Sequence, residues 1–484
     1  MDHAEAEAIY DAGRRVCVQF ILDLAARVEQ LEDRLRRLEE QARQDSRTSS
    51  KPPSQDPPKT RQQRRAQARA KAKELLRREG AQRTAGAQPG HQGAGRGLAP
   101  EDQLDEIVDH YPDACRGCGR EFALDECTPG ARFGRHQVSE LPPISVFVVE
   151  HRTHRLRCPQ CRARTAAELP DGIGGSAFGP NLQAAVVTLT ARHRISRRGM
   201  AELARELFGL GLSPGAVDAI CQRAGDALAG PHARLREWVL DQRAVHVDET
   251  GWRTAGDSRA LWTATSAGAA IFKIAEHCDR EQFDVLIGAY PGIIVSDRWP
   301  GYEHLDPHQR QVCWSHLQRD FRRHSEGLAE QQTFGQQGLE LSGRVFTAWR
   351  AYQHDHHDPQ RLQADVEPIQ AQLRQLLEHG GRKSPRSRHH RRFANNLIKV
   401  WPALWTFVSV EGVEPTNNPA ERALRGPVIH RKLSHGTRSD DGERFAERVL
   451  SAAATCRLQD RSLFAYLREL IAARNRGHPL PTLT

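Results

Sequence analysis

Two aspartates stand at or near the ends of strand-like segments, a placement that suits metal chemistry. Asp248 lies in AVHVDETGW (residues 244–252), where apolar and polar residues alternate, and Asp297 closes GIIVSD (residues 292–297). If these two strands are neighbours, the carboxylates repel each other unless a cation lies between them. Carboxylates that hold paired Mg²⁺ ions are what two-metal phosphoryl transfer requires. Alternation along the strand sends Glu249 to the opposite face, so we expect only Asp248 of this pair to serve the site.

Glu421, in the segment PTNNPAERAL, is the candidate for a third acid. We expect Asn418 to cap a helix with Pro419 at its first position, which places Glu421 at the third. A glutamate at that position also fits a capping box, so these residues leave both metal binding and capping open. The rival acids are Glu414, Asp441 and Glu443.

Two Cys-x-x-Cys pairs predict a structural zinc site, because each pair offers two thiolates and four sulfurs complete a tetrahedral zinc. Residues 119–157 separate the pairs, a longer gap than usual. Within that gap, PPISVFVVEHRTHRLR indicates a strand that returns the chain to the site. Free thiols or a redox pair are the alternative. The expected zinc ligands are Cys115, Cys118, Cys158 and Cys161.

The elements around the aspartates must bring them together. Period-two patterns predict strands over residues 244–252, 259–266 and 270–276, followed by a helix over 279–290 and a fourth strand over 292–297. With the first three strands antiparallel and the fourth beside the first, Asp248 and Asp297 lie at adjacent strand ends. Mostly helical sequence then fills residues 320–410.

Upstream of the strands, residues 195–228 predict two helices separated by a Gly209-Leu210-Gly211 turn. Ser213 is the expected cap of the second helix, with Pro214 at its first position. This outline fits a DNA-reading helix-turn-helix and also fits an ordinary helical hairpin.

The N-terminal segment predicts a helix with an apolar seam at alternating spacings of three and four residues. Such a seam indicates self-association through a coiled coil, or else an amphipathic helix packed on its own domain. The seam consists of Ile21, Leu24, Val28, Leu31, Leu35, Leu38 and Ala42.

The chain of 484 residues carries a formal net charge of +9, which favours a polyanionic partner. Between Arg43 and Pro100, fourteen Lys or Arg residues stand against four acids. The segment at 61–78 fits contacts to a nucleic-acid backbone as well as a solvated tail. No secretion signal and no membrane-spanning apolar run is evident, so we expect a cytosolic protein with reduced thiols and no membrane partner. The candidate DNA contacts in this segment are Arg64, Arg65 and Arg69.

Several motifs together resemble the transposases of the bacterial insertion sequence 66 family, over roughly residues 20–455. They are TSSKPPS, QPGHQG, the paired Cys-x-x-Cys turns, VDETGW, SDRWPGY, CWSHLQRDF, and NNPAERALR followed by RK and HGTRS. The resemblance implies a ribonuclease-H-like core with a helical insertion between the second aspartate and the glutamate, here residues 298–420. By position in the motifs, Asp248, Asp297 and Glu421 carry over as the catalytic acids. Cys313 and His316 match a Cys-x-x-His element of such families, with either a chemical role or a packed helix start. Arg298-Trp299 depart from the Gly-Tyr that often follows the second aspartate.

The implied function is a DNA transposase that cleaves the ends of its element and joins the freed 3′-hydroxyls to target DNA. Its expected cofactors are two Mg²⁺ ions, with Mn²⁺ as a substitute, and structural Zn²⁺. The expected partners are double-stranded DNA, a second copy of the chain on that DNA, and helper proteins from the same element, in the bacterial nucleoid. A structure-specific nuclease and a non-catalytic DNA-binding regulator are the alternatives. The candidate contacts to the DNA backbone are Arg422, Arg425, Arg431 and Lys432.

We therefore predict a multidomain α/β protein, built around the ribonuclease-H-like core. The predicted segments are a coiled-coil helix (1–45), a basic linker and helix (46–100), a zinc-binding domain (101–175), a helix-turn-helix-like domain (181–235), the first part of the core (240–325), the helical insertion (326–410) and the completion of the core with Glu421 (411–484).

Overall fold

The fold is that of a computed structural model. It describes residues 10–43, 97–123, 134–142, 144–173, 176–354 and 358–484, together with residues 7 and 66. The chain divides into two compact units, one of residues 61–147 and one of residues 1–60 with 148–484, and each is described by itself. Within the described residues, no helix is both long and apolar enough to span a membrane.

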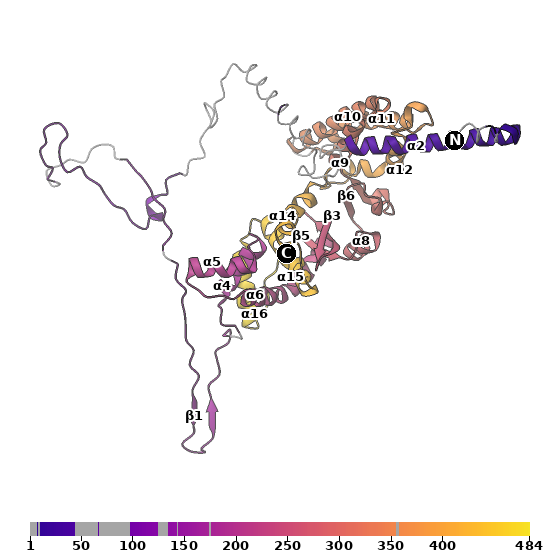
Figure 1. The fold of residues 1–484 in the computed structure, drawn as a ribbon. Helices are drawn as coiled ribbons and strands as arrows, with labels where there is room; N and C mark the ends of the chain where they lie inside the picture. Colours follow the sequence, from indigo (N-terminus) through magenta and orange to yellow (C-terminus); the bar gives the residue numbers. More distant parts are fainter. Residues whose placement is uncertain are drawn as a thin grey trace. The chain divides into compact units, whose positions relative to one another are not determined.

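A five-stranded mixed sheet lies at the centre of the larger unit (Figure 1). Its order is β5-β4-β3-β6-β7, with β3, β4 and β5 antiparallel and β3, β6 and β7 parallel. The predicted pairing of the fourth strand beside the first is therefore confirmed. β7 was not predicted, because three residues (RQV) carry no readable period. The bounds are β3 (Ala244–Thr254), β4 (Asp257–Thr265), β5 (Ala270–Ala275), β6 (Ile293–Ser296) and β7 (Arg310–Val312).

One hydrophobic core joins the sheet to helices from both ends of this unit. Val187 and Ile220 from upstream helices, Trp262 from β4, and Leu467 from the C-terminal helix are all fully buried in it. The helices are α4 (Pro180–Ala191), α5 (Arg197–Phe208), α6 (Pro214–Ala227), α7 (Ala229–Leu240), α8 (Arg280–Ile287), α15 (Asp440–Leu458) and α16 (Leu463–Asn475).

The predicted turn between α5 and α6 is confirmed. Gly209 ends α5 in the left-handed region at φ 62°, where a side chain would be strained. The Ser213 hydroxyl accepts the N–H of Ala216 and caps α6, which begins at Pro214. Residues of α4, α5 and α6 belong to the same hydrophobic core as residues of β3 and β4. The helix pair is therefore packed on the sheet that carries Asp248.

A second core lies under the helices between β7 and the Glu421 segment. Trp314, Phe321, Leu373 and Trp405 are among its buried residues, which confirms the mostly helical character of this stretch. Its helices are α9 (Trp314–Ser325), α10 (Ala329–His354), α11 (Pro359–Gly381), α12 (Arg391–Lys399) and α13 (Thr406–Ser409), and α14 (Asn418–Ser434) follows. Short 3₁₀ turns occur at Glu101–Gln103, Pro300–Tyr302, Pro307–Gln309, Pro385–Ser387 and Pro402–Leu404.

The N-terminal helix is present as α2 (Arg14–Arg43), and its seam residues Ile21, Leu31 and Leu35 are exposed. Self-association through this helix stays a prediction. Most of the basic linker, including Arg64, Arg65 and Arg69, lies outside the described residues.

Candidate active site

Asp248 and Glu249 are neighbours on β3 with different partners. The Asp248 carboxylate accepts the N–H of Glu249 at 3.0 Å. The Glu249 carboxylate accepts the hydroxyl hydrogen of buried Tyr302 at 2.7 Å. The two carboxylates therefore accept hydrogen bonds from different donors, and the charge of Glu249 raises the pKa of Asp248.

Four acids of this region interact electrostatically: Asp248, Glu249, Asp297 and Glu421. Burial raises the pKa of Asp248 well above its usual range, and the charges of Glu249, Asp297 and Glu421 raise it further. Burial and the charge of Asp297 raise the pKa of Glu249 to about 7. Within the described chain, no Lys or Arg side chain forms an ion pair with Asp248, Glu249 or Asp297. Hard oxygen ligands that repel one another in a poorly hydrated place fit a divalent cation.

Asp297 follows β6 on a loop that is held by a buried arginine from β7. Arg310 is 2% exposed, and its guanidinium donates to the backbone oxygens of Asp297 at 2.6 Å and Tyr302 at 3.0 Å, and to the Ser296 hydroxyl at 3.1 Å. Burial lowers the pKa of Arg310 to about 10, so it is still a cation at neutral pH. Arg310 has no signal in the sequence, because the two backbone oxygens and the Ser296 hydroxyl that it contacts come together only in the folded sheet.

Glu421 lies in the first turn of α14, but the predicted cap is wrong. The capping position belongs to Asn417, and its side chain makes no capping hydrogen bond. Instead the Asn417 amide donates to the Val247 carbonyl oxygen on β3 at 2.8 Å. Asn418 is already the first helical residue, so no Asn418 cap is paired with Glu421 in a capping box. The Glu421 carboxylate lies 3.5 Å from Nδ1 of His316.

The Cys-x-x-His element lies at the start of α9, directly against the Glu421 segment. The sulfur of Cys313 accepts the N–H of Asn417 at 3.1 Å. Donor atoms of Cys313, His316 and Glu421 lie within 4.8 Å of one another. Among the described residues, Asp248, Asp297 and Glu421 do not form so close a group, and their relation is the electrostatic one given above.

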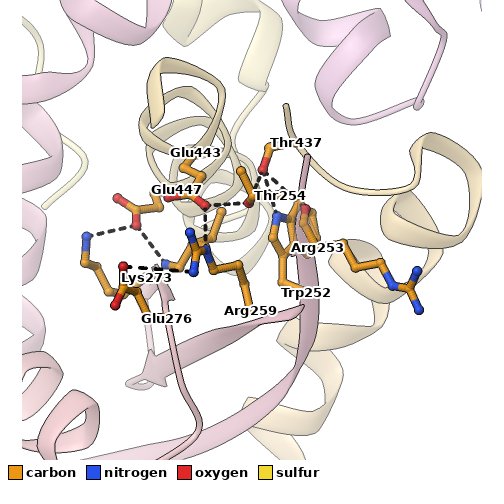
Figure 2. A network of polar contacts seen from close by, with 10 residues as sticks. Trp252, Arg253, Thr254, Arg259, Lys273, Glu276, Thr437, Glu443 and Glu447 are labelled. Atoms are coloured by element: carbon orange, nitrogen blue, oxygen red, sulfur yellow. Dashed lines mark hydrogen bonds and ion pairs between the residues drawn. The ribbon is translucent and has the colours of Figure 1, made fainter. Parts of the chain in front are cut away.

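The rival acids have structural partners elsewhere. Glu443 accepts the Thr254 hydroxyl at 2.5 Å, at the far end of β3 from Asp248. Figure 2 shows Trp252, Thr254 and Glu443 converging around Thr437, while the side chain of Arg253 points away from this network. Asp441 pairs with Arg444, and Glu414 is half-buried near Arg422.

The basic residues of α14 differ in their exposure and surroundings. Arg422, Arg425 and Lys432 are exposed, and none of the three forms an ion pair in the described chain. Arg431 lies over β3, where a Cβ at Gly251 would come within 3.1 Å of its Nη1. Burial and nearby Arg253 lower the pKa of Arg431. Cations without acidic partners suit a polyanionic ligand.

The two cysteine pairs lie in turns of the same shape. The N–H of Gly119 donates to the Cys115 oxygen and that of Arg162 to the Cys158 oxygen, with the second turn joining β1 (Arg155–Arg157) to β2 (Arg164–Ala166). Backbone N–H groups, chiefly those of Cys118 and Cys161 respectively, lower the pKa values of Cys115 and Cys158. Such turns favour the thiolate that a metal ligand requires.

Comparison with known proteins gives two family matches and one relative. Residues 175–444 match the family described as Transposase IS66 family, and residues 2–97 match a family of unknown function. The chain is 23% identical over 424 residues to "Uncharacterized protein y4hP" of Sinorhizobium fredii, covering 79% of this chain and 74% of that protein. The IS66 match contains all three candidate acids.

Proposed function

The chain belongs to the IS66 transposase family, and from this premise we propose that it cleaves DNA at its element's ends and joins the 3′ ends to target DNA. The observation that supports this proposal is electrostatic: the charges of Asp297, after β6, and Glu421, at the start of α14, both raise the pKa of Asp248 on β3. Membership of a transposase family implies DNA as the partner. Hydrolysis alone, by a structure-specific nuclease, is the competing outcome.

The sheet supports assignment of a ribonuclease-H-like core. Three antiparallel strands followed by two parallel ones carry Asp248 on the central strand and Asp297 after its parallel neighbour. The helical stretch between Asp297 and Glu421 corresponds to the expected insertion. The chain then returns to β3 with α14, which brings Glu421 back to the sheet.

Asp248, Asp297 and Glu421 are the residues that would hold Mg²⁺ or Mn²⁺, because their carboxylates repel one another without a cation. When bound, two such ions lower the pKa of an attacking water or hydroxyl and stabilise the leaving oxygen. Arg310 fixes the loop that presents Asp297. Arg422, Arg425, Arg431 and Lys432 would hold the DNA backbone alongside β3.

The remaining modules would serve assembly and end recognition. We propose that α2 pairs two copies, that the α5–α6 helices and the basic linker contact DNA, and that Cys115, Cys118, Cys158 and Cys161 bind one structural zinc. Helper proteins of the same element would act with this assembly.

The test compares Asp248→Asn, Asp297→Asn and Glu421→Gln with the matched control Glu414→Gln. Loss of a metal ligand removes several kcal/mol of transition-state stabilisation, so each site variant should cleave at least about a thousandfold more slowly. Binding to end DNA should persist, and Glu414→Gln should cleave normally. The measurement is cleavage and strand transfer on labelled element ends with Mg²⁺. Normal cleavage by Glu421→Gln would exclude that residue from the triad, and cleavage without joining would favour the nuclease.

A further inference from the structure

Two buried residues are hydrogen-bonded to all three acid-bearing segments. The Cys313 N–H donates to the Ser296 oxygen at 2.9 Å, and the Cys313 sulfur accepts the Asn417 N–H at 3.1 Å. The Asn417 side chain donates to the Val247 oxygen at 2.8 Å. Ser296 directly precedes Asp297, Val247 directly precedes Asp248, and Asn417 lies one helical turn before Glu421. The chain Ser296–Cys313–Asn417–Val247 therefore links the backbones that present the acids.

Burial makes these hydrogen bonds costly to break. Cys313 and Asn417 are both 0% exposed, so water cannot replace a lost partner. The next residue strengthens the same junction, because the Trp314 N–H donates to the Pro415 oxygen at 2.8 Å. The Glu421 N–H donates to the Asn417 oxygen at 3.2 Å, which ties the first turn of α14 to the linked residue itself.

His316 continues this contact one turn into α9. Its Nδ1 lies 3.5 Å from the Glu421 carboxylate. This nitrogen atom is buried and has no hydrogen-bond partner, although the residue as a whole is half-buried. Burial lowers the pKa of His316, against the charges of Asp297 and Glu421. A neutral imidazole at this distance limits the positions that the Glu421 carboxylate can take on the side of α9.

We infer that Cys313 and Asn417 are positioning residues that hold Asp248, Asp297 and Glu421 at the spacing a divalent cation needs, with His316 orienting Glu421. The inference rests on the proposed function. It assigns the Cys-x-x-His element to alignment of the acids. Direct ligation of a transition metal by Cys313, His316 and Glu421 is the competing role. Cys313 is 0% exposed, and burial raises the pKa of its thiol to about 11 despite the N–H that Asn417 donates to the sulfur, which disfavours a thiolate ligand there at neutral pH.

The test measures Mn²⁺ binding to the full-length protein by calorimetry, without DNA, beside the Mn²⁺ dependence of end cleavage. Replacing residues that orient metal ligands typically costs 10–100-fold in metal affinity, so Asn417→Ala and Cys313→Ala should weaken Mn²⁺ binding by about that factor. Cys313→Ser should restore much of the affinity, because a hydroxyl also accepts the Asn417 N–H. Cys456→Ala, which removes another fully buried thiol from a different core, is the control and should leave Mn²⁺ binding unchanged.

His316→Ala, at a half-buried position, carries the test if Cys313→Ala does not fold; it should weaken Mn²⁺ binding, with partial rescue by His316→Gln. Wild-type Mn²⁺ affinity in folded Asn417→Ala, Cys313→Ala or His316→Ala would overturn the inference. So would a zinc ion that the wild type binds and both Cys313→Ala and Cys313→Ser lose, since Cys313 would then be a ligand. A wild-type protein that neither binds Mn²⁺ nor cleaves DNA would overturn the proposed function as well.

Discussion

Glu249 is an acid in an apolar, aromatic setting, beside an acid that is proposed to bind metal. It accepts the Tyr302 hydroxyl, and the Tyr302 ring packs edge-on against Phe283, Trp262 and Trp299. Burial and the charge of Asp297 raise its pKa to about 7 from an ordinary 4.5. The folded protein therefore binds this proton more tightly than the unfolded chain, and ionisation of Glu249 opposes folding.

We expect Glu249→Gln to stabilise the metal-free protein at pH 8 and to leave its stability nearly unchanged near pH 4. The reason is proton linkage. The folded protein holds the Glu249 proton more tightly than the unfolded chain, so wild-type Glu249 does not weaken folding below its unfolded pKa. Its ionisation progressively lowers the free energy of unfolding as pH rises from about 4.5 to about 7. The gain at pH 8 should be about 1–3 kcal/mol. Urea unfolding at both pH values measures it, with the exposed acid variant Glu303→Gln as control. An equal gain at both pH values would contradict this origin.

The candidate acids have clearer signals in the sequence than the residues that contact their segments. Asp297 directly follows the apolar strand β6, and Glu421 lies in the first turn of α14, as the sequence predicts. Asp248 was expected near a strand end but lies in the middle of β3, because that strand continues to Thr254. Arg310 and Asn417 have no such signal, because their partners come together only in the folded sheet. Asn417 donates to a backbone oxygen of β3, and Arg310 donates to two backbone oxygens of the 297–302 loop and to the Ser296 hydroxyl. The expected cap at Asn418 was wrong for a related reason: Asn417 occupies the capping position and uses its side chain on β3.

At the scale of elements, α15 protects the edge of the sheet. β5 is an edge strand, and unpaired N–H groups on such a strand invite pairing with other chains. Three side chains of α15, four residues apart, accept alternate N–H groups of β5. Four residues of helix rise about 6 Å, close to the ~6.6 Å of two strand residues, so the two rows match. The pairs are Glu447 with Ile274, Ser451 with Phe272 and Thr455 with Ala270. Figure 2 shows Glu447 also reaching Lys273.

Ser451→Ala should destabilise the protein by about 1–3 kcal/mol, because it leaves the buried Phe272 N–H without an acceptor. Ser342→Ala is the matched control. Its hydroxyl is also 0% exposed, but it only donates to the Gly338 oxygen of its own helix. Chemical unfolding gives the two free energies, and hydrogen exchange at Phe272 should accelerate in the Ser451 variant alone. Equal destabilisation by both variants would mean that packing, and not the β5 contact, determines the loss.

Elements with a strong local pattern were predicted, and those defined by tertiary contacts were not. Alternation located β3 to β6, and capping residues located the start of α6. β7 and the match between α15 and β5 were missed, since a three-residue strand and a row of polar helix residues have no signal before the sheet forms.

At the scale of the whole molecule, we predict that the two cysteine turns, which are far apart in the sequence, bind one zinc ion together. Replacing Cys115 and Cys158 by Ser should release one zinc per chain and lower the thermal stability of residues 101–175, because structural zinc contributes folding free energy. Cys278→Ser, which removes an exposed thiol outside both turns, should keep the zinc. Metal analysis by mass spectrometry decides the point. A wild-type protein without zinc would leave the turns as pairs of free thiols.

Assembly is the other property that belongs to the whole molecule. Concerted cutting and joining of two ends needs at least two protomers on DNA, and α2 offers an apolar seam for their contact. The seam side chains of Ile21, Leu24, Val28, Leu31 and Leu35 are between 47% and 65% exposed. Val16 and Leu22 are exposed to a similar extent on the same helix but lie off the seam. These two sets allow a comparison in which the added charge is equal and only its place on the helix differs.

Leu31→Glu with Leu35→Glu should therefore dissociate the oligomer, whereas Val16→Glu with Leu22→Glu should leave it intact. Carboxylates buried unpaired in a coiled-coil seam cost roughly 3–5 kcal/mol, enough to raise the dissociation constant by more than about a hundredfold. Paired-end cleavage should fall in the seam variant, while its zinc content stays unchanged, because none of the four expected zinc ligands belongs to α2. Sedimentation velocity of both variants, free and bound to end DNA, gives the oligomeric state. An oligomer that survives the seam charges in both conditions would place dimerisation on another surface and make α2 a helix that packs within its own chain.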